Sequence, residues 1–352
     1  MVVDQRWRGG AQSNKDVGKK SIGKLFGFFG FVIELLMLLV TAKRYDFAYL
    51  GIAPWAHTAM RDMILAGLAK RLAKRTWIHV HGNGLSELVE HPGLRGLLAR
   101  WLLSGTEVIA ITEDACQKAK ALGLFSRVLP LANMSVDPGE TEKPSQGKIT
   151  IACLGNLDPR KGVLDFVDIV SAVAREDKRV HAVIVGGETA QLSVEDVKAR
   201  AAKHGVADHI NVTGWVTEEH KTDLLSEADI FLYMSRHDLA PVALIEALAH
   251  GCAPIVLDIG GLAEMVGPQL HSNVIVETES ESALPHAQDM IRAYLGVPEL
   301  LAQDKARARH RYLTTYSPEI FKTTLLGFLK SADDAGPARS EPSSDMIASQ
   351  PS

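Results

Sequence analysis

Two carboxylates, Asp238 and Glu246, bracket a junction at which a short apolar run gives way to a helical pattern. The run reads as a buried strand and the pattern over 242–250 as a helix, so the loop 235–241 lies at the carboxyl end of a strand. Ligands bind at this place in α/β sheets, and the free N–H groups that begin the helix favour a phosphate. Carboxylates accept hydrogen bonds from paired hydroxyl groups, as on a ribose or a hexose. The spacing by itself also fits two ordinary solvent contacts.

A second loop of the same kind, 155–162, leads into a predicted helix over 163–175. Its Arg160 and Lys161 are expected to donate charge-assisted hydrogen bonds to a diphosphate at the helix start. The segment Asp-Pro-Arg-Lys-Gly is also ordinary turn composition, so a solvated turn is the alternative.

In the amino-terminal half, His81 directly follows a predicted strand over 76–80. A side chain at a strand end faces the ligand side of the sheet, so we expect a catalytic role for His81. The alternative is that its ring holds the glycine turn 82–84. His79 lies inside the strand, and we expect it in the core.

Strand and helix patterns alternate along the chain, which predicts an α/β protein with parallel sheets. A stretch rich in Pro, Gly and charge, 135–148, is typical of a linker. We therefore expect one domain over 1–134 and a second over 149–330. Residues 331–352 are rich in Ser, Pro and Asp, and we expect a disordered tail there.

The chain has 352 residues, of which 46% are apolar and 23% are charged, as in globular proteins. Three cysteines without metal-ligand spacing favour a reducing compartment. Residues 1–106 carry 15 Lys and Arg against 7 Asp and Glu, although the whole chain has a net charge of −4. A basic amino-terminal part suits a phosphate-rich membrane or an anionic acceptor, and equally a solvated basic face. We expect no nucleic-acid partner.

Residues 26–40 form an apolar run that follows four lysines, Lys15, Lys19, Lys20 and Lys24. The run is shorter than the roughly 20 residues that cross a bilayer, and it contains Glu34. We expect a buried or interfacial helix in a cytoplasmic protein. Attachment at the inner face of the membrane is the alternative.

The segment 231–266 resembles the signature of family 4 of the retaining glycosyltransferases, E-G-F-x-x-x-x-L-E-A-M-A-x-G-x-P-V-V followed by G-G-x-x-E. The chain has Asp238 for the first glutamate of that pattern, Leu239 for the next glycine, and Asn156 where the family usually has an arginine. The residues in register are Ser235, Pro241, Glu246, Ala247, Ala249, Gly251, Pro254, Gly260, Gly261 and Glu264.

The amino-terminal half is similar to bacterial family 4 enzymes of surface-polysaccharide assembly. The resemblance implies the GT-B fold, two Rossmann-like domains that face a cleft, with acceptor binding in the first domain and nucleotide-sugar binding in the second. The similar segments are Ser21 to Lys24, Tyr45-Asp46, Arg61-Asp62 and His79 to Gly84.

The same resemblance implies the roles of individual residues. Asp238 would contact the transferred sugar, Glu246 would bind the ribose, and Lys161 would bind the diphosphate. Backbone amides within the segment Leu239, Ala240, Pro241 and Val242 would hold the diphosphate. Gly214 and Val216 would line the base pocket. No Asp-x-Asp motif occurs, so we expect no metal and no other cofactor.

The expected function is retaining transfer of a sugar from a nucleotide diphosphate sugar to a lipid-linked or polysaccharide acceptor. Three alternatives stay open: a GT-B nucleotide-sugar epimerase, a catalytically weak GT-B binding or scaffold protein, and a peripheral membrane module. Nothing before Ser21 supplies the strand and helix with which this family normally begins. We therefore expect an amino-terminal domain that lacks its first strand–helix unit, with exposed strand edges, poor solubility and low activity.

Overall fold

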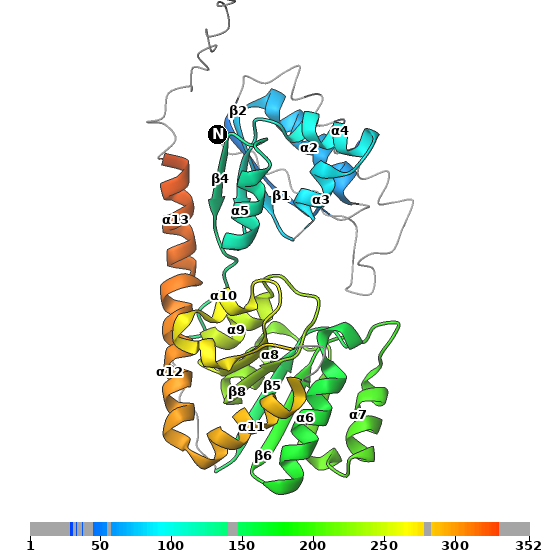
Figure 1. Cartoon of the computed structure of the whole chain (residues 1–352), viewed down its shortest axis with the longest axis vertical. Helices are drawn as coiled ribbons and strands as arrows, with labels where there is room; N and C mark the ends of the chain where they lie inside the picture. The colour runs from blue at the N-terminus through cyan, green and yellow to red at the C-terminus, as the bar shows by residue number, and fades with distance from the viewer. Residues whose placement is uncertain are drawn as a thin grey trace, which may run out of the picture.

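The computed structural model describes residues 29–30, 33, 37, 45–54, 58–82, 84–139, 147–277 and 283–330. These residues form two α/β units, one above the other in Figure 1, with the last two helices running along one side of both. The expected linker lies partly, and the expected tail entirely, outside the described residues. The same is true of nearly all of the apolar run 26–40 and of everything before Ser21, so the missing first unit stays a prediction.

The amino-terminal unit contains a parallel sheet in the order β1-β2-β3-β4. The order follows the chain, so each strand returns through a helix to pair beside the one before it. In the described sheet β1 is an edge strand. The elements are β1 Tyr45–Ile52, α2 Thr58–Leu72, β2 Ala73–Val80, α3 Leu85–Glu90, α4 Leu94–Leu103, β3 Glu107–Ala110, α5 Glu113–Ala121 and β4 Arg127–Pro130.

The carboxyl-terminal unit contains a six-stranded parallel sheet in the order β10-β9-β8-β5-β6-β7. The chain order reverses direction between β5 and β8, and ligands bind at such switch points. Its strands are β5 Ile149–Leu154, β6 Val180–Val185, β7 Ile210–Gly214, β8 Ile230–Tyr233, β9 Ala253–Leu257 and β10 Val274–Ile275. Its helices include α6 Val163–Glu176, α7 Val194–Lys203, α8 Glu218–Glu227, α9 Val242–Ala249, α10 Leu262–Val266, α11 Ala283–Gly296 and α12 Pro298–Thr315.

The six-stranded sheet is buried on both faces. Every residue of β8 and β9 is buried, as expected for the continuous apolar runs of parallel strands. One cluster packs around Phe166 and Ile169 of α6, and the other around Leu244 and Leu248 of α9.

The amino-terminal sheet is covered differently on its two faces. Helices α2, α4 and α5 pack on one face around Met63 and Ile78. On the other face, Trp77 and Ile109 contact α13 (Pro318–Lys330) through Phe321 and Leu325. The last helix of the chain therefore packs on the first sheet, beside β4 in Figure 1.

The alternating α/β architecture with parallel sheets is confirmed. The predicted strand over 76–80 begins earlier, at Ala73, directly after α2 ends at Leu72, because this segment pairs with β1 from Tyr45 onward. Helices α12 and α13 meet near Tyr316. No helix among the described residues is long and apolar enough to cross a membrane.

Candidate functional site

The two loops that carry the expected ligand residues lie against each other at the carboxyl edge of the second sheet. The backbone N–H of Arg236 donates to the carbonyl of Arg160 over 3.0 Å. Gly162 begins α6 with a φ of +70°, and a Cβ at this position would lie 2.1 Å from the carbonyl oxygen of Met234. Only glycine permits both this conformation and this approach. The loops 155–162 and 235–241 therefore form one continuous surface.

Asp238 is the centre of a hydrogen-bond network on this surface. Its carboxylate accepts from Lys161 Nζ at 2.5 and 2.7 Å, across 77 residues of sequence. It also accepts from the hydroxyl groups of Tyr233 and Ser235, each at 2.6 Å. The Lys161 and Asp238 side chains are 27% and 18% exposed. The structure thus brings two expected ligand residues together as a partly buried ion pair.

Burial works against ionisation of Asp238, but the hydrogen bonds from Lys161, Ser235 and Tyr233 outweigh it and lower the pKa of the carboxyl group. Burial, together with the nearby Asp238 charge, raises the pKa of Tyr233 far above its ordinary value. Asp238 is therefore an anion and Tyr233 a neutral donor throughout the neutral range. A ligand phosphate at Lys161 must compete with an anion that is already in place.

Arg160 has a different environment from Lys161. Its guanidinium pairs with Asp158 at 2.7 Å and stays 61% exposed. Asp158 also accepts from the backbone N–H of Arg160, which closes the turn before α6. This geometry agrees with the turn interpretation of Arg160, whereas Lys161 points to the Asp238 network. Asn156, which replaces the family arginine, is exposed.

Glu246 lies in α9 and also pairs with a lysine. Lys221 of α8 donates to Glu246 over 2.8 Å and contacts Glu218 at 2.7 Å. Burial works against the charge of Lys221, but the bonds to Glu218 and Glu246 outweigh it and raise its pKa. The carboxylate of Glu246 is about one-fifth exposed, at 18%. A ribose hydroxyl pair at Glu246 would therefore share this carboxylate with Lys221.

Glycines stand at the carboxyl ends of β5, β6 and β7, where they allow neighbouring backbones to approach each other closely. A Cβ at Gly186 would lie 1.7 Å from the carbonyl oxygen of Gly155, and Gly214 has a φ of +71°. The next residue, Trp215, is 65% exposed, and Val216 is half-buried. An exposed tryptophan beside Gly214 offers a stacking face, as the expected base pocket requires.

The first N–H groups of α9 have no partner inside the helix, because no preceding turn supplies carbonyl groups. The residues around this helix start, Leu239, Ala240 and Pro241, are half-buried, and Val242 is 43% exposed. Pro241 takes the N-cap position without a side-chain cap. This arrangement leaves the positive end of the helix accessible to an anion.

His81 follows β2 and is linked to the second domain by one side chain. It hydrogen-bonds Asn133, and the Asn133 Nδ2 group donates to the carbonyl of Ala240 over 3.3 Å. Neighbouring protein atoms displace water from part of the ring, and this desolvation lowers the pKa of His81 although the residue is exposed. The hydrogen bond to Asn133 raises the pKa by a smaller amount. His81 is therefore neutral at pH 7 and can accept a proton.

His79 lies inside β2 and is 2% exposed, as expected for a core residue. Its Nδ1 atom is 2.5 Å from the Tyr49 hydroxyl, and its ring stacks at a tilt on that of His81, 4.3 Å between centroids. Burial, and then the nearby His81, lower the pKa of His79 to about 3.

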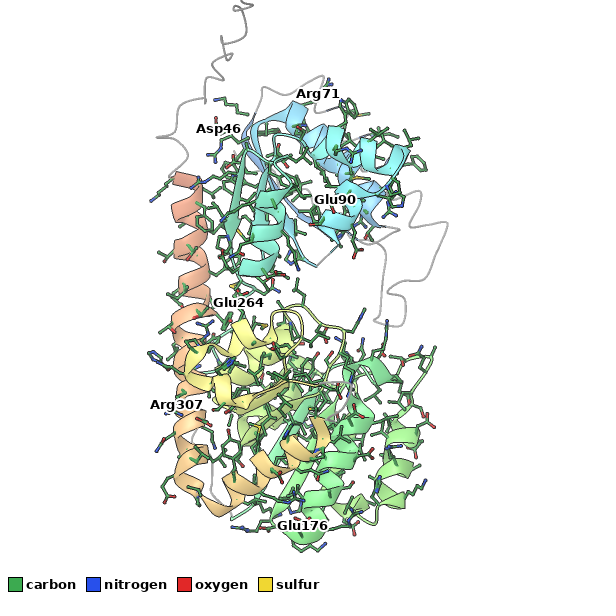
Figure 2. All side chains as sticks on the ribbon, viewed as in Figure 1. Asp46, Arg71, Glu90, Glu176, Glu264 and Arg307 are labelled. Atoms are coloured by element: carbon green, nitrogen blue, oxygen red, sulfur yellow. The ribbon has the colours of Figure 1, made fainter. Side chains whose placement is uncertain are left out.

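Glu264, the last glutamate of the motif region, joins the two domains (Figure 2). Both of its carboxylate oxygens accept from the backbone N–H of Glu113, at 2.9 and 3.0 Å, at the start of α5. Thr112 caps the same helix by accepting from Ala115. A Cβ at Gly261 would lie 2.6 Å from Thr112 Cγ2, so glycine allows the domains to meet here.

Sequence reasoning missed four residues that position the site: Tyr233, Ser235, Lys221 and Asn133. Tyr233 and Ser235 are buried, and their roles follow from the fold around Asp238. Ser235 had a signal, because it lies in register with the family pattern. Among the described residues, no group of three or more His, Cys, Asp or Glu side chains is arranged to hold a metal ion. A recess of about 120 Å³ lies between α12 and residues 266–269, and Asp238 does not line it.

Comparison with solved structures defines the class of protein. The fold is that of Anabaena HepE in complex with UDP, with a TM-score of 0.66, 17% identity and coverage of 84% of this chain and 82% of that one. Sucrose-phosphate synthase from Thermosynechococcus elongatus gives a TM-score of 0.67 at 15% identity, over 94% and 83% of the two chains. The protein therefore has the GT-B fold, as the sequence predicts.

Residues 148–293 match the family model of Glycosyl transferases group 1, which covers the Lys161, Asp238 and Glu246 loops. The chain is also similar to GDP-mannose:cellobiosyl-diphosphopolyprenol alpha-mannosyltransferase of Xanthomonas oryzae, at 23% identity over 139 residues, 40% of this chain and 36% of that protein. The chain spans about a third of the length of the first curated relatives that it matches. The family-model match lies within the carboxyl-terminal domain.

Proposed function

We propose that this protein is a retaining glycosyltransferase of the family 4 type that moves a sugar from a nucleotide diphosphate sugar to a lipid-linked or glycan acceptor. The observation that carries the proposal is the Lys161–Asp238 pair at the start of α9, inside the region that matches the glycosyltransferase model. The similar Xanthomonas enzyme has a diphosphopolyprenol acceptor in its name, which supports the acceptor class.

In this proposal the diphosphate of the donor binds between Lys161 and the N–H groups that begin α9. Its negative charge competes with Asp238 for Lys161, because both anions use the same ammonium group. Tyr233 and Ser235 both donate to Oδ2 of Asp238 and keep the carboxylate in place. Once Lys161 turns to the diphosphate, Oδ1 can accept a hydrogen bond from a hydroxyl group of the transferred sugar. Glu246 and Lys221 form the ribose end of the site.

The reaction breaks the bond between the anomeric carbon and the diphosphate oxygen and forms a bond from that carbon to the acceptor oxygen. The acceptor hydroxyl gives up a proton, which the neutral ring of His81 can accept, and the diphosphate leaves as an anion. Lys161 and the dipole of α9 stabilise that charge. We propose that this stabilisation makes a metal ion unnecessary, so EDTA should leave the rate unchanged. In this proposal His81, from the amino-terminal domain, acts on the acceptor side.

We also propose that the enzyme works in the cytoplasm at the inner face of the membrane, where lipid-linked acceptors are found, as part of surface-polysaccharide assembly. The predicted contact through residues 15–40 remains part of this proposal. Nearly all of this segment lies outside the described residues.

A GT-B protein that binds nucleotide with weak or no transfer is the second candidate. Two observations favour it: Asn156 replaces the family arginine, and the negative charge of Asp238 is already balanced by an ion pair with Lys161. An epimerase remains a third outcome of the same experiment.

The test is incubation of the full chain with a panel of radiolabelled nucleotide diphosphate sugars and a membrane lipid extract. Label in the lipid fraction, lost in Asp238→Asn, is the expected result. Epimerised donor without lipid label would identify the epimerase. Nucleoside diphosphate binding by calorimetry without any turnover would identify the binding protein, and the absence of both binding and turnover would refute the proposal.

A further inference from the structure

Helix α4 presents an apolar stripe to solvent. Leu94, Leu97 and Trp101 are 72%, 57% and 67% exposed, and their spacing of three and four residues places them on one helix face. The opposite face, with Ala99 and Leu103, is buried in the domain core. An ordinary surface helix buries its apolar face and exposes a polar one. Helix α4 is apolar on both faces, and one of these apolar faces is exposed to solvent.

The stripe is held rigidly. Lys70 of α2 donates to the carbonyl oxygens of Leu102 and Ser104, at 3.3 and 2.6 Å, at the end of α4. Arg100 donates to the carbonyl of Val89 over 2.7 Å. The exposed side chains therefore project from a helix whose carboxyl-terminal end is fixed to α2 and to the end of α3.

The neighbouring helix α2 continues the apolar surface with Met60 and Ile64, which are 39% and 36% exposed. The two helices contact each other on the same face of the sheet. We call Leu94, Leu97, Trp101, Met60 and Ile64 the α2–α4 surface.

Charge distinguishes this surface from a simple apolar patch. Helices α2 and α4 contain five basic residues, Arg61, Lys70, Arg71, Arg95 and Arg100, and one acidic residue, Asp62. Asp62 is 4% exposed and pairs with Arg61, so it adds no negative charge to the surface.

Two acidic side chains that precede α4, Glu87 and Glu90, lie on α3. Glu107, which follows α4, is buried and pairs with Arg75. Figure 2 shows Glu90 closer to the carboxyl-terminal domain and Arg71 at the far outer end of the molecule. Asp46 also lies toward that outer end, but it pairs with Lys74 of β2. Among the charged residues of α2 and α4 themselves, the basic ones are in excess.

We propose that the α2–α4 surface docks on an anionic lipid bilayer, with Leu94, Leu97 and Trp101 in the interface and Arg71 and Arg95 near the lipid phosphates. Tryptophan suits the boundary between acyl chains and headgroups, and basic residues add attraction to anionic lipid. A second copy of the chain fits less well, because like-charged surfaces would meet and the stripe is short for a stable interface. The proposal does not depend on transferase activity and concerns a surface separate from residues 15–40.

The test is co-sedimentation of the full chain with vesicles, without any nucleotide sugar. Binding to mixed phosphatidylcholine and phosphatidylglycerol vesicles should exceed binding to phosphatidylcholine alone and should fall with added salt. The double variant Leu97→Ala/Trp101→Ala should bind the mixed vesicles at least about tenfold more weakly. Trp215→Ala is the matched control, because Trp215 is equally exposed but lies on the other domain, and it should bind like the unaltered chain.

A second variant, Arg71→Glu/Arg95→Glu, separates charge from apolar contact. It should weaken binding to mixed vesicles and leave the small binding to phosphatidylcholine unchanged. Unaltered binding in both double variants would overturn the proposal, including the case in which residues 15–40 carry all of the binding. Self-association that Leu97→Ala/Trp101→Ala abolishes, measured by ultracentrifugation without vesicle binding, would assign the surface to a second copy instead.

Discussion

The two sheets share one parallel design but differ in how completely it is buried. In the carboxyl-terminal sheet β8 and β9 have no exposed residue, whereas β1 of the amino-terminal sheet exposes Phe47 and Tyr49 by 53% and 43%. The loops of the second sheet contact each other through glycines and ion pairs, and the helices of the first sheet present apolar side chains outward. Tight packing thus accompanies the carboxyl-terminal domain, and accessible apolar surface accompanies the amino-terminal domain.

The largest expected effect tests this contrast in burial. Phe166→Ala removes a fully buried ring from the core of the second domain and should lower the free energy of unfolding by about 3 to 5 kcal/mol. Phe47→Ala removes a half-exposed ring from the edge strand and should change it by less than about 1 kcal/mol. Urea unfolding measures both. A cost at Phe47 similar to that at Phe166 would show that β1 is covered in solution.

The next effect concerns ligand binding in the second domain. Lys161→Ala should weaken nucleoside diphosphate binding by about 1.5 to 3 kcal/mol, the usual size for a hydrogen bond to a charged group. Arg160→Ala is the neighbouring control and should have a smaller effect, because Arg160 pairs with Asp158 in the turn. Calorimetry measures both, and an unchanged affinity in Lys161→Ala would remove Lys161 from the site.

Removing the partner of Lys161 should have the opposite sign. Asp238→Asn releases Lys161 from its ion pair and removes a negative charge beside the phosphate site, so nucleoside diphosphate affinity should rise, by up to roughly tenfold. Turnover should fall, because the sugar contact is lost. Glu246→Gln should instead lower the affinity. Lower affinity in both variants would show that Asp238 does not compete with the diphosphate.

A smaller, pH-dependent effect belongs to the first domain. The pKa of His79 is about 3 in the fold and about 6.5 in an unfolded chain, so the unfolded state binds more protons between these values. Stability should therefore fall as the pH drops below about 6.5, by at most about 1.4 kcal/mol for each pH unit. Urea unfolding at about pH 7.5 and about pH 5.5 measures this slope, the change in the free energy of unfolding with pH. His79→Phe should reduce it, and an unchanged slope would assign the effect to other groups.

The smallest expected effect lies between the domains. Glu264→Gln keeps the shape of the side chain but weakens its bonds to the Glu113 N–H and to the positive end of α5, by about 1 kcal/mol or less. Small-angle scattering should then show a wider distribution of domain orientations. Glu219→Gln, an exposed change on α8, is the control. Identical scattering from Glu264→Gln and the unaltered chain would mean that other contacts hold the domains.

Much of the fold could be predicted from local sequence. The apolar runs of β8 and β9 specify buried parallel strands, and Thr112 followed by Glu113 and Asp114 specifies the start of α5, where the Thr112 side chain caps the helix. Glycines at 162 and 260 fall where backbones meet, because no other residue takes a positive φ at such short distances. The strand runs and the helix start depend on neighbours in the chain, so the sequence by itself determines them. The approach of Met234 to Gly162 and of Asp238 to Gly260 is decided by the fold.

Contacts between distant segments were decided only by the tertiary structure. Asp238 and Lys161 could be named as ligand residues from sequence, but their mutual pairing depends on how β5 and β8 lie side by side. Tryptophans show the same limit: Trp77 is fully buried, whereas Trp101 and Trp215 are exposed by 67% and 65%. Residue type sets what a side chain can bind, and the packing of remote elements sets whether it is covered, paired or available, because burial and ion pairing are properties of the space around an atom.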